Sequence, residues 1–137
     1  MQRRAETMAF APGRAVFPGG AAQDVDTDLV DTAIREVFEE IGVRLSRDEL
    51  RPWSRWVTPN GRPIRYDARF FVAVAPPGQD VENRTSEAVE LFWVRPADAF
   101  GLPLMRPTSA TLVSLRGYAT AGHVLAAAPS TMPEPRS

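Results

Sequence analysis

The sequence contains no cysteine, no lysine and a single histidine, His123. Without cysteine the chain can form neither disulfides nor thiolate metal sites, and it has no cysteine nucleophile. The absence of lysine likewise excludes a lysine nucleophile, and one histidine cannot supply a metal-binding pair, so we expect a structural or surface role for His123. The net charge of −1 argues against broad electrostatic binding to nucleic acid. Carboxylates and arginines are left to carry any chemistry.

Long apolar stretches are also missing. No run approaches the roughly 18 residues of a membrane span, and no signal peptide is recognisable, so we expect a cytoplasmic protein without a membrane partner. The 137 residues are 44% hydrophobic and 24% charged, which suits one soluble domain with its own core. We expect this domain to span residues 1–128 and the Pro-rich residues 129–137 to form a disordered tail.

The most informative stretch is residues 35–43, Arg-Glu-Val-Phe-Glu-Glu-Ile-Gly-Val. Glu36, Glu39 and Glu40 are spaced i, i+3 and i+4, so on a helix they share one face. Like charges this close repel, and their clustering does not stabilise a helix. A hard divalent cation, Mg²⁺ or Mn²⁺, would explain the cluster because it prefers carboxylate oxygens. The alternative is a solvated acidic face.

The residues around the glutamates predict an amphipathic helix that runs to about Ile41. Asp26 or Asp28 is placed to cap its start, and Gly42 is able to end it in the left-handed conformation. The apolar side chains fall on the side opposite the glutamates, and we expect that side to dock on a sheet. These side chains are Val30, Ile34, Val37, Phe38 and Ile41.

A glycine turn, Phe17-Pro18-Gly19-Gly20, precedes this helix. Together with residues 35–43 it resembles the signature of the Nudix hydrolases, in which Gly, five residues, Glu and seven residues lead into Arg-Glu-aliphatic-any-Glu-Glu-any-Gly-aliphatic. The second half matches here at every specified position, which makes the signal specific. The resemblance implies an α/β (α+β) fold, a Nudix-type α/β/α sandwich with a mixed sheet.

The first half of the signature departs from the family pattern. Counting forward from Gly20 reaches Asp26 where the pattern has Glu, and counting back from the helix reaches Thr27. The loop therefore carries a one-residue insertion. In the family that glutamate supports the helix arginine, here Arg35, by an ion pair, and Asp26 or Asp28 is expected to replace it.

Other stretches predict the remaining elements. Asn60-Gly61 indicates a hairpin turn, Pro96 begins a helical turn, and Gly117 and Gly122 weaken the last helix. The strands are expected at 14–17, 52–57, 65–74 and 89–94, and the last helix at 108–127, capped by Thr108. Gln2-Arg3-Arg4 resembles the end of the second strand of Nudix domains. The first strand is thus expected to be missing, through a misassigned start codon or a natural N-terminal truncation.

Further candidate site residues lie outside the helix. The turn glycines Gly19 and Gly20 let the backbone pass close to a ligand. Arg65 and Arg69 lie on one strand and are candidates to bind a phosphate, with an ion pair to Asp67 or a helix acid as the equal alternative. The general base is one of the helix glutamates or one of two later acids, Glu87 and Glu90.

A closer resemblance covers about residues 8–125. Residues 8–13, 56–59 and 65–71 are similar to stretches of the peroxisomal acyl-coenzyme A diphosphatases and their bacterial relatives. This implies metal-dependent cleavage of a nucleoside diphosphate linked to another group, with coenzyme A or acyl-coenzyme A as the substrate. Two alternatives remain: an ADP-ribose or nucleoside triphosphate pyrophosphatase, and a catalytically silent ligand-binding protein. A homodimer is expected by analogy only.

Overall fold

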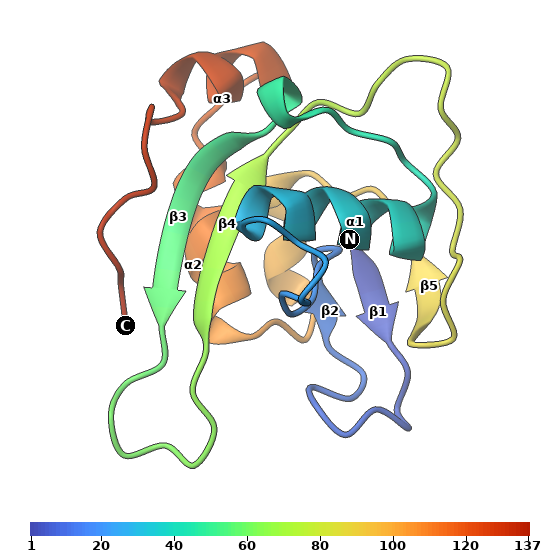
Figure 1. The fold of residues 1–137 in the computed structure, drawn as a ribbon, viewed down its shortest axis with the longest axis vertical. Helices are drawn as coiled ribbons and strands as arrows, with labels where there is room; N and C mark the ends of the chain where they lie inside the picture. The colour runs from blue at the N-terminus through green and yellow to red at the C-terminus, as the bar shows by residue number, and fades with distance from the viewer.

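The computed structural model describes all residues from Met1 to Ser137. Its strands form two antiparallel sheets, one in the order β2-β1-β5 and one pairing β3 with β4 (Figure 1). The strands are β1 (Gln2–Arg4), β2 (Ala15–Val16), β3 (Arg51–Val57), β4 (Asp67–Val72) and β5 (Ala88–Leu91). The α-helices are α1 (Leu29–Ile41), α2 (Arg106–Leu115) and α3 (Ala121–Ala127), with 3₁₀ turns at Arg47–Glu49 and Pro96–Gly101.

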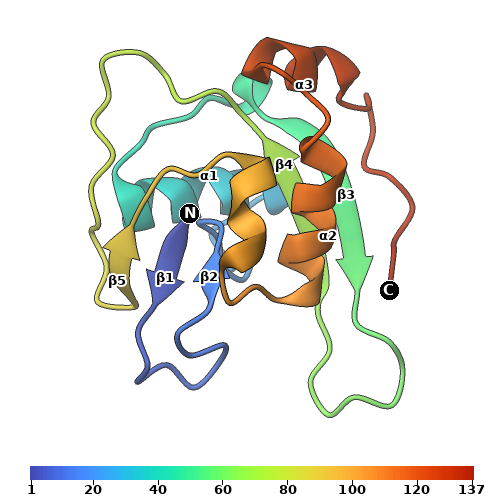
Figure 2. The same ribbon diagram turned by 180° about the vertical axis from the view of Figure 1, so that it is seen from behind.

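The sheets lie between helices. Helix α1 crosses one face of the strands, and α2 covers the opposite face, as the two opposed views show (Figures 1 and 2). This confirms the predicted sandwich of helix, sheet and helix. None of the helices combines the length and apolar character that a membrane crossing requires.

Helix α1 has the predicted ends. The Asp28 carboxylate accepts hydrogen bonds from the backbone N–H groups of Val30 and Asp31, so Asp28 rather than Asp26 is the cap. At the other end Gly42 has a φ of 75° and donates its N–H to the Phe38 carbonyl. A side chain at position 42 would strain this conformation, which explains the glycine there.

The predicted hairpin is confirmed. Residues Arg51 to Val57 pair with Val72 to Asp67, and Gly61 in the connecting turn has a φ of 85°. The indole N–H of Trp53 donates to the Ser114 hydroxyl at 2.8 Å, which ties β3 to α2.

Two predictions for the last third of the chain are wrong. The single helix over 108–127 is divided into α2 and α3, because residues 116–120 leave the helix and Thr120 caps a new one. Thr108 is not a cap: Met105 precedes α2, and Thr108 is buried inside it. Farther along the chain, Arg136 exchanges backbone hydrogen bonds with Arg55 and Val57 along β3.

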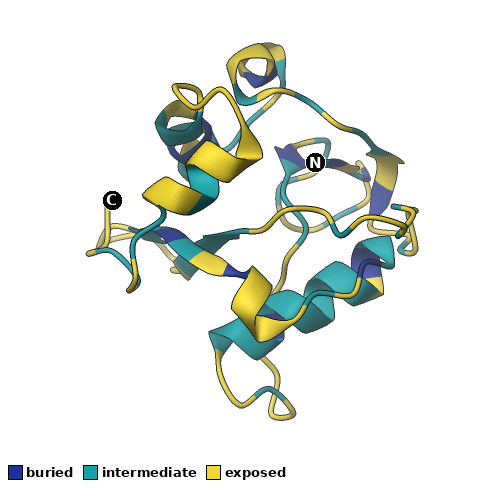
Figure 3. Cartoon of the chain, turned by 90° about the horizontal axis from the view of Figure 1, so that it is seen from above, coloured by how far each residue is buried: buried dark blue, intermediate teal, exposed yellow.

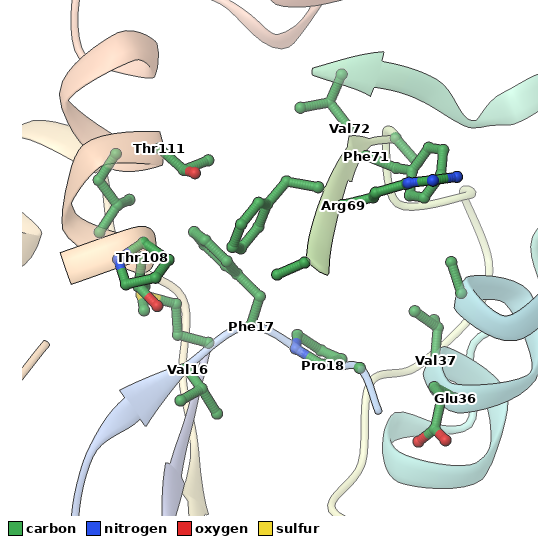
Figure 4. Close-up of a pocket in the computed structure, with 18 of the residues that line it drawn as sticks. Val16, Phe17, Pro18, Glu36, Val37, Arg69, Phe71, Val72, Thr108 and Thr111 are labelled. Atoms are coloured by element: carbon green, nitrogen blue, oxygen red, sulfur yellow. The ribbon is translucent and has the colours of Figure 1, made fainter. Parts of the chain in front are cut away.

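The interior is unusually open. Only 13 of the 137 residues are buried, and they are scattered along the chain (Figure 3). A cavity of about 2200 Å³ lies between the helices and the sheets (Figure 4). Instead of one mixed sheet, β2 and β4 belong to separate sheets, and no strand pairs the two. Side chains make the contact between the two sheets: the rings of Phe17 and Phe70 pack edge to face, with their centroids 6.0 Å apart. The apolar side of α1 therefore borders the cavity through Val37 and Ile41 and remains half-buried.

Candidate active site

Arg35 connects the glycine turn to α1. Its Nε and Nη2 atoms donate to the two carboxylate oxygens of Asp26, each at 2.9 Å, and Nη2 also donates to the Ala21 carbonyl at 3.1 Å. The guanidinium holds the pKa of Asp26 well below its ordinary range, mainly through these hydrogen bonds. Asp26 is thus the acid that supports Arg35, one of the two alternatives that the sequence left open.

The same guanidinium lies between two glutamates of the helix. Nη1 donates to Glu36 Oε1 at 2.8 Å and to Glu39 Oε2 at 3.1 Å. One positively charged group therefore offsets the repulsion between two carboxylates that lie on one face. The acidic face is therefore partly neutralised from within its own helix.

Glu40, the third glutamate, is buried, with 5% of its surface exposed. Its Oε2 atom accepts hydrogen bonds from the backbone N–H of Gly19 at 2.8 Å and from Nε2 of Gln2 at 3.0 Å. Burial raises the pKa of Glu40, and the nearby carboxylates of Glu36 and Glu87 add to this, while the two donated bonds oppose it. The acidic face is thus only partly solvated.

The two turn glycines contact the helix glutamates. Gly19 supplies the N–H group to Glu40, and an added Cβ at Gly20 would lie 2.5 Å from the Glu36 carboxyl group. A real Cβ cannot approach so closely, so a side chain at position 20 would force the Glu36 carboxyl group to move away from the turn. The glycines therefore position the turn on the glutamates.

The donor set matches a hard divalent cation in chemistry. Glu36, Glu39 and Glu40 offer only carboxylate oxygens, which Mg²⁺ and Mn²⁺ prefer, and Arg35 already provides a cation between two of them. The three carboxylates do not converge on one point, however, and no group of three acidic or histidine side chains in the chain does. Binding an ion with all three would require their side chains to rotate.

The two late acids lie in different surroundings. Glu87 is exposed, lines the cavity together with Glu36, and is close enough to affect the pKa of Glu40. Glu90 lies on β5 and forms a salt bridge with Arg3 on the neighbouring strand. The structure therefore brings Glu87, but not Glu90, toward the helix glutamates.

The two candidate phosphate-binding arginines both line the cavity. Arg65 donates to the Thr58 carbonyl at 3.2 Å, and Arg69 lies 3.6 Å from Asp67. No bond joins either to an acid of α1. Figure 4 shows Arg69 on one side of the cavity, with Glu36 of α1 and Thr108 of α2 on two others.

Two contributors to the site were missed by the sequence analysis. Gln2 donates to Glu40, and the Thr32 hydroxyl donates to Asp26 Oδ2 at 3.0 Å. The signal for Thr32 was available, because it lies one turn before Glu36 on the predicted helix. Gln2 had no such signal, because its position depends on how distant strands pair.

Comparison with known proteins adds independent findings. The profile of the NUDIX domain matches residues 1–115. A crystal structure of a NUDIX hydrolase from Alicyclobacillus acidocaldarius superposes with a TM-score of 0.76 at 27% identity, covering 95% of this chain and 88% of that one. The fold is therefore that of a solved Nudix hydrolase.

Curated relatives carry similar names. The Nudix hydrolase NudL of Photorhabdus laumondii is 26% identical over 74% of this chain and 53% of its own length. The peroxisomal coenzyme A diphosphatase NUDT7 of Mus musculus is 40% identical over 47 residues, which are 34% of this chain and 20% of that protein. The chain spans about half the length of the first relatives it matches, 46% and 53%.

Proposed function

The chain belongs to the Nudix family, and we propose that it is a divalent-metal-dependent hydrolase that cleaves the diphosphate bond of coenzyme A or an acyl-coenzyme A. The observation that carries this proposal is the contact between the glycine turn and the acidic face of α1. Gly19 and Gly20 lie against Glu40 and Glu36, while Arg35 and Asp26 fix the connecting loop.

Each part of this arrangement has a chemical use. Glu36, Glu39 and Glu40 would hold the metal, which when bound neutralises phosphate charge and lowers the pKa of water. Arg35 acts by position: its ion pair with Asp26 holds the loop on the helix. Holding the loop in place leaves only the glutamate side chains to rotate when the ion and the charged substrate bind.

The reaction consumes one water molecule. Its oxygen attacks a phosphorus atom of the diphosphate, the bond from that phosphorus to the bridging oxygen breaks, and a carboxylate accepts the proton. The products are adenosine 3′,5′-bisphosphate and a phosphopantetheine, acylated or free. Among the late acids Glu87 suits the role of base better than Glu90, because Glu90 is paired with Arg3.

The choice of coenzyme A rests on two similarities. Stretches outside the glutamate helix resemble the acyl-coenzyme A diphosphatases, and a relative named for coenzyme A cleavage is 40% identical over 47 residues. Arg65 and Arg69 line the cavity, and they are our candidates to bind a phosphate of the substrate.

A catalytically silent nucleotide-binding protein is the second candidate. The observation in its favour is that no three acidic side chains converge. A binding protein has use for the glycine turn and for the salt bridges of Arg35, but it does not need a complete metal site. Turnover distinguishes the two candidates directly.

A substrate panel tests the proposal. Purified protein with Mg²⁺ is given coenzyme A, an acyl-coenzyme A, ADP-ribose and nucleoside triphosphates, and products are separated by chromatography. We expect the coenzyme A compounds to be cleaved fastest and a chelator to stop all turnover. Faster cleavage of ADP-ribose would overturn the substrate assignment, and binding without any cleavage would favour the silent protein.

A further inference from the structure

Gln2 is a polar side chain in a position that suits an apolar one. It lies on β1, the central strand of its sheet, and pairs with Val16 on one side and Leu91 on the other. Only 2% of its surface is exposed, so its amide is almost completely removed from water. Burying an amide costs free energy unless its donors and acceptors are paired.

Half of that amide is left unpaired. Nε2 donates to Glu40 Oε2 at 3.0 Å, but the buried Oε1 atom of Gln2 accepts no hydrogen bond. An unpaired buried acceptor lowers stability, and a methionine or leucine of similar size would avoid this cost. Packing in the core therefore does not explain an amide at position 2, whereas its bond to Glu40 does.

The two donors to Glu40 leave one of its oxygens free. Gly19 N and Gln2 Nε2 both bind Oε2, and Oε1 of Glu40 accepts no bond from the protein. Nor is Oε1 among the buried atoms that lack a partner. The two donors thus hold one oxygen of Glu40 and leave the other unbonded and not fully buried.

We propose that Gln2 is a positioning residue, whose amide fixes the Glu40 carboxylate so that its free oxygen can bind a divalent cation together with Glu36. This inference rests on the proposed function, because it assigns Gln2 a task in the same metal site. Gln2 itself touches neither metal nor substrate; it acts through Glu40. Gly19 provides the second, backbone contact to the same oxygen.

The test compares Mn²⁺ binding by electron paramagnetic resonance in the wild-type protein and in Gln2→Met, which keeps the side-chain length and removes the donor. We expect Gln2→Met to bind Mn²⁺ about 10-fold more weakly or worse, as when a partner of a metal ligand is lost. Ser114→Ala is the control, because it removes the half-buried hydroxyl of α2 that accepts the Trp53 hydrogen bond and does not touch the acidic face. It should bind Mn²⁺ like the wild type.

A second measurement does not depend on the variant folding. The side-chain N–H₂ resonances of Gln2 in the wild-type protein should shift as Mg²⁺ is added and saturate at the concentration that saturates binding. Unchanged Mn²⁺ affinity in a folded Gln2→Met protein, or Gln2 resonances that ignore Mg²⁺, would overturn the role of Gln2 and leave the proposed function standing. A wild-type protein that neither binds Mn²⁺ nor turns over substrate would overturn both.

Discussion

Arg35 is the residue on which the site depends most. It contacts Asp26 in the loop and both Glu36 and Glu39 on its own helix. A lysine could not replace it, because a single ammonium group lacks the planar fork that binds the two oxygens of Asp26 and still reaches the glutamates. Arg35 thus joins the loop to the helix and also offsets the negative charge of the acidic face.

The Asp26–Arg35 pair predicts a pH dependence of stability. The pKa of Asp26 is lower in the folded protein than in the unfolded chain. The ionised Asp26 therefore stabilises the fold at pH values above its unfolded pKa of about 4. That stability is lost as the pH falls below this value toward the folded pKa. We expect Asp26→Asn to melt at a lower temperature than the wild type at pH 7, with the difference shrinking below about pH 4.

Thermal unfolding of both proteins between pH 7 and pH 3 provides the measurement. Asp24→Asn is the matched control, because Asp24 is exposed in the same loop and forms no salt bridge. Melting curves for wild type and Asp26→Asn that stay parallel through the acid range would contradict the assignment.

At the scale of elements, helix α1 does not bury its apolar side against a sheet, as the sequence predicted. The fully buried residues of α1 are Thr32 and Glu40, not its apolar ones. The reason is that the glycine turn and β1 pack on the acidic face, while the opposite side borders a cavity instead of a joined sheet. Hydrogen bonds to Glu40 therefore help to hold this helix in place.

The cavity predicts opposite effects for two similar substitutions. Ala33 on α1 lines the cavity, so Ala33→Leu adds apolar contact and should stabilise the protein by about 0.5–2 kcal/mol. Ala99 is completely buried and does not line the cavity, so Ala99→Leu should destabilise it by about 1–3 kcal/mol. Urea unfolding measures both. Equal destabilisation by the two leucines would show that the interior is packed in solution.

At the scale of the whole molecule, local signals were the reliable ones. The helix with its cap and its terminal glycine, the Asn-Gly hairpin and the helical turn at Pro96 were all predictable because neighbouring residues determine them. The helix, sheet and helix layers followed from the resemblance. These features put the three glutamates on one helix that follows the glycine turn.

Features that depend on distant contacts were not predictable. Gln2 reaches Glu40 across 38 residues of sequence, and the tail pairs with β3 through Arg136. The choice between Asp26 and Asp28 also needed coordinates, because both lie in the same acidic loop and only the geometry assigns one to Arg35 and the other to the cap. Composition and spacing contain no information on such pairings.

The measurement that tests the central claim most directly is coenzyme A hydrolysis with Mg²⁺ by wild type, Glu40→Gln and Glu134→Gln. Adenosine 3′,5′-bisphosphate is quantified by chromatography, and circular dichroism verifies the fold. Glu40→Gln should lose at least about 100-fold in rate, since the metal contributes several kcal/mol to the transition state. Glu134→Gln, a change of an exposed acid in the C-terminal tail, should match the wild type. A folded Glu40→Gln protein with wild-type activity would contradict the account.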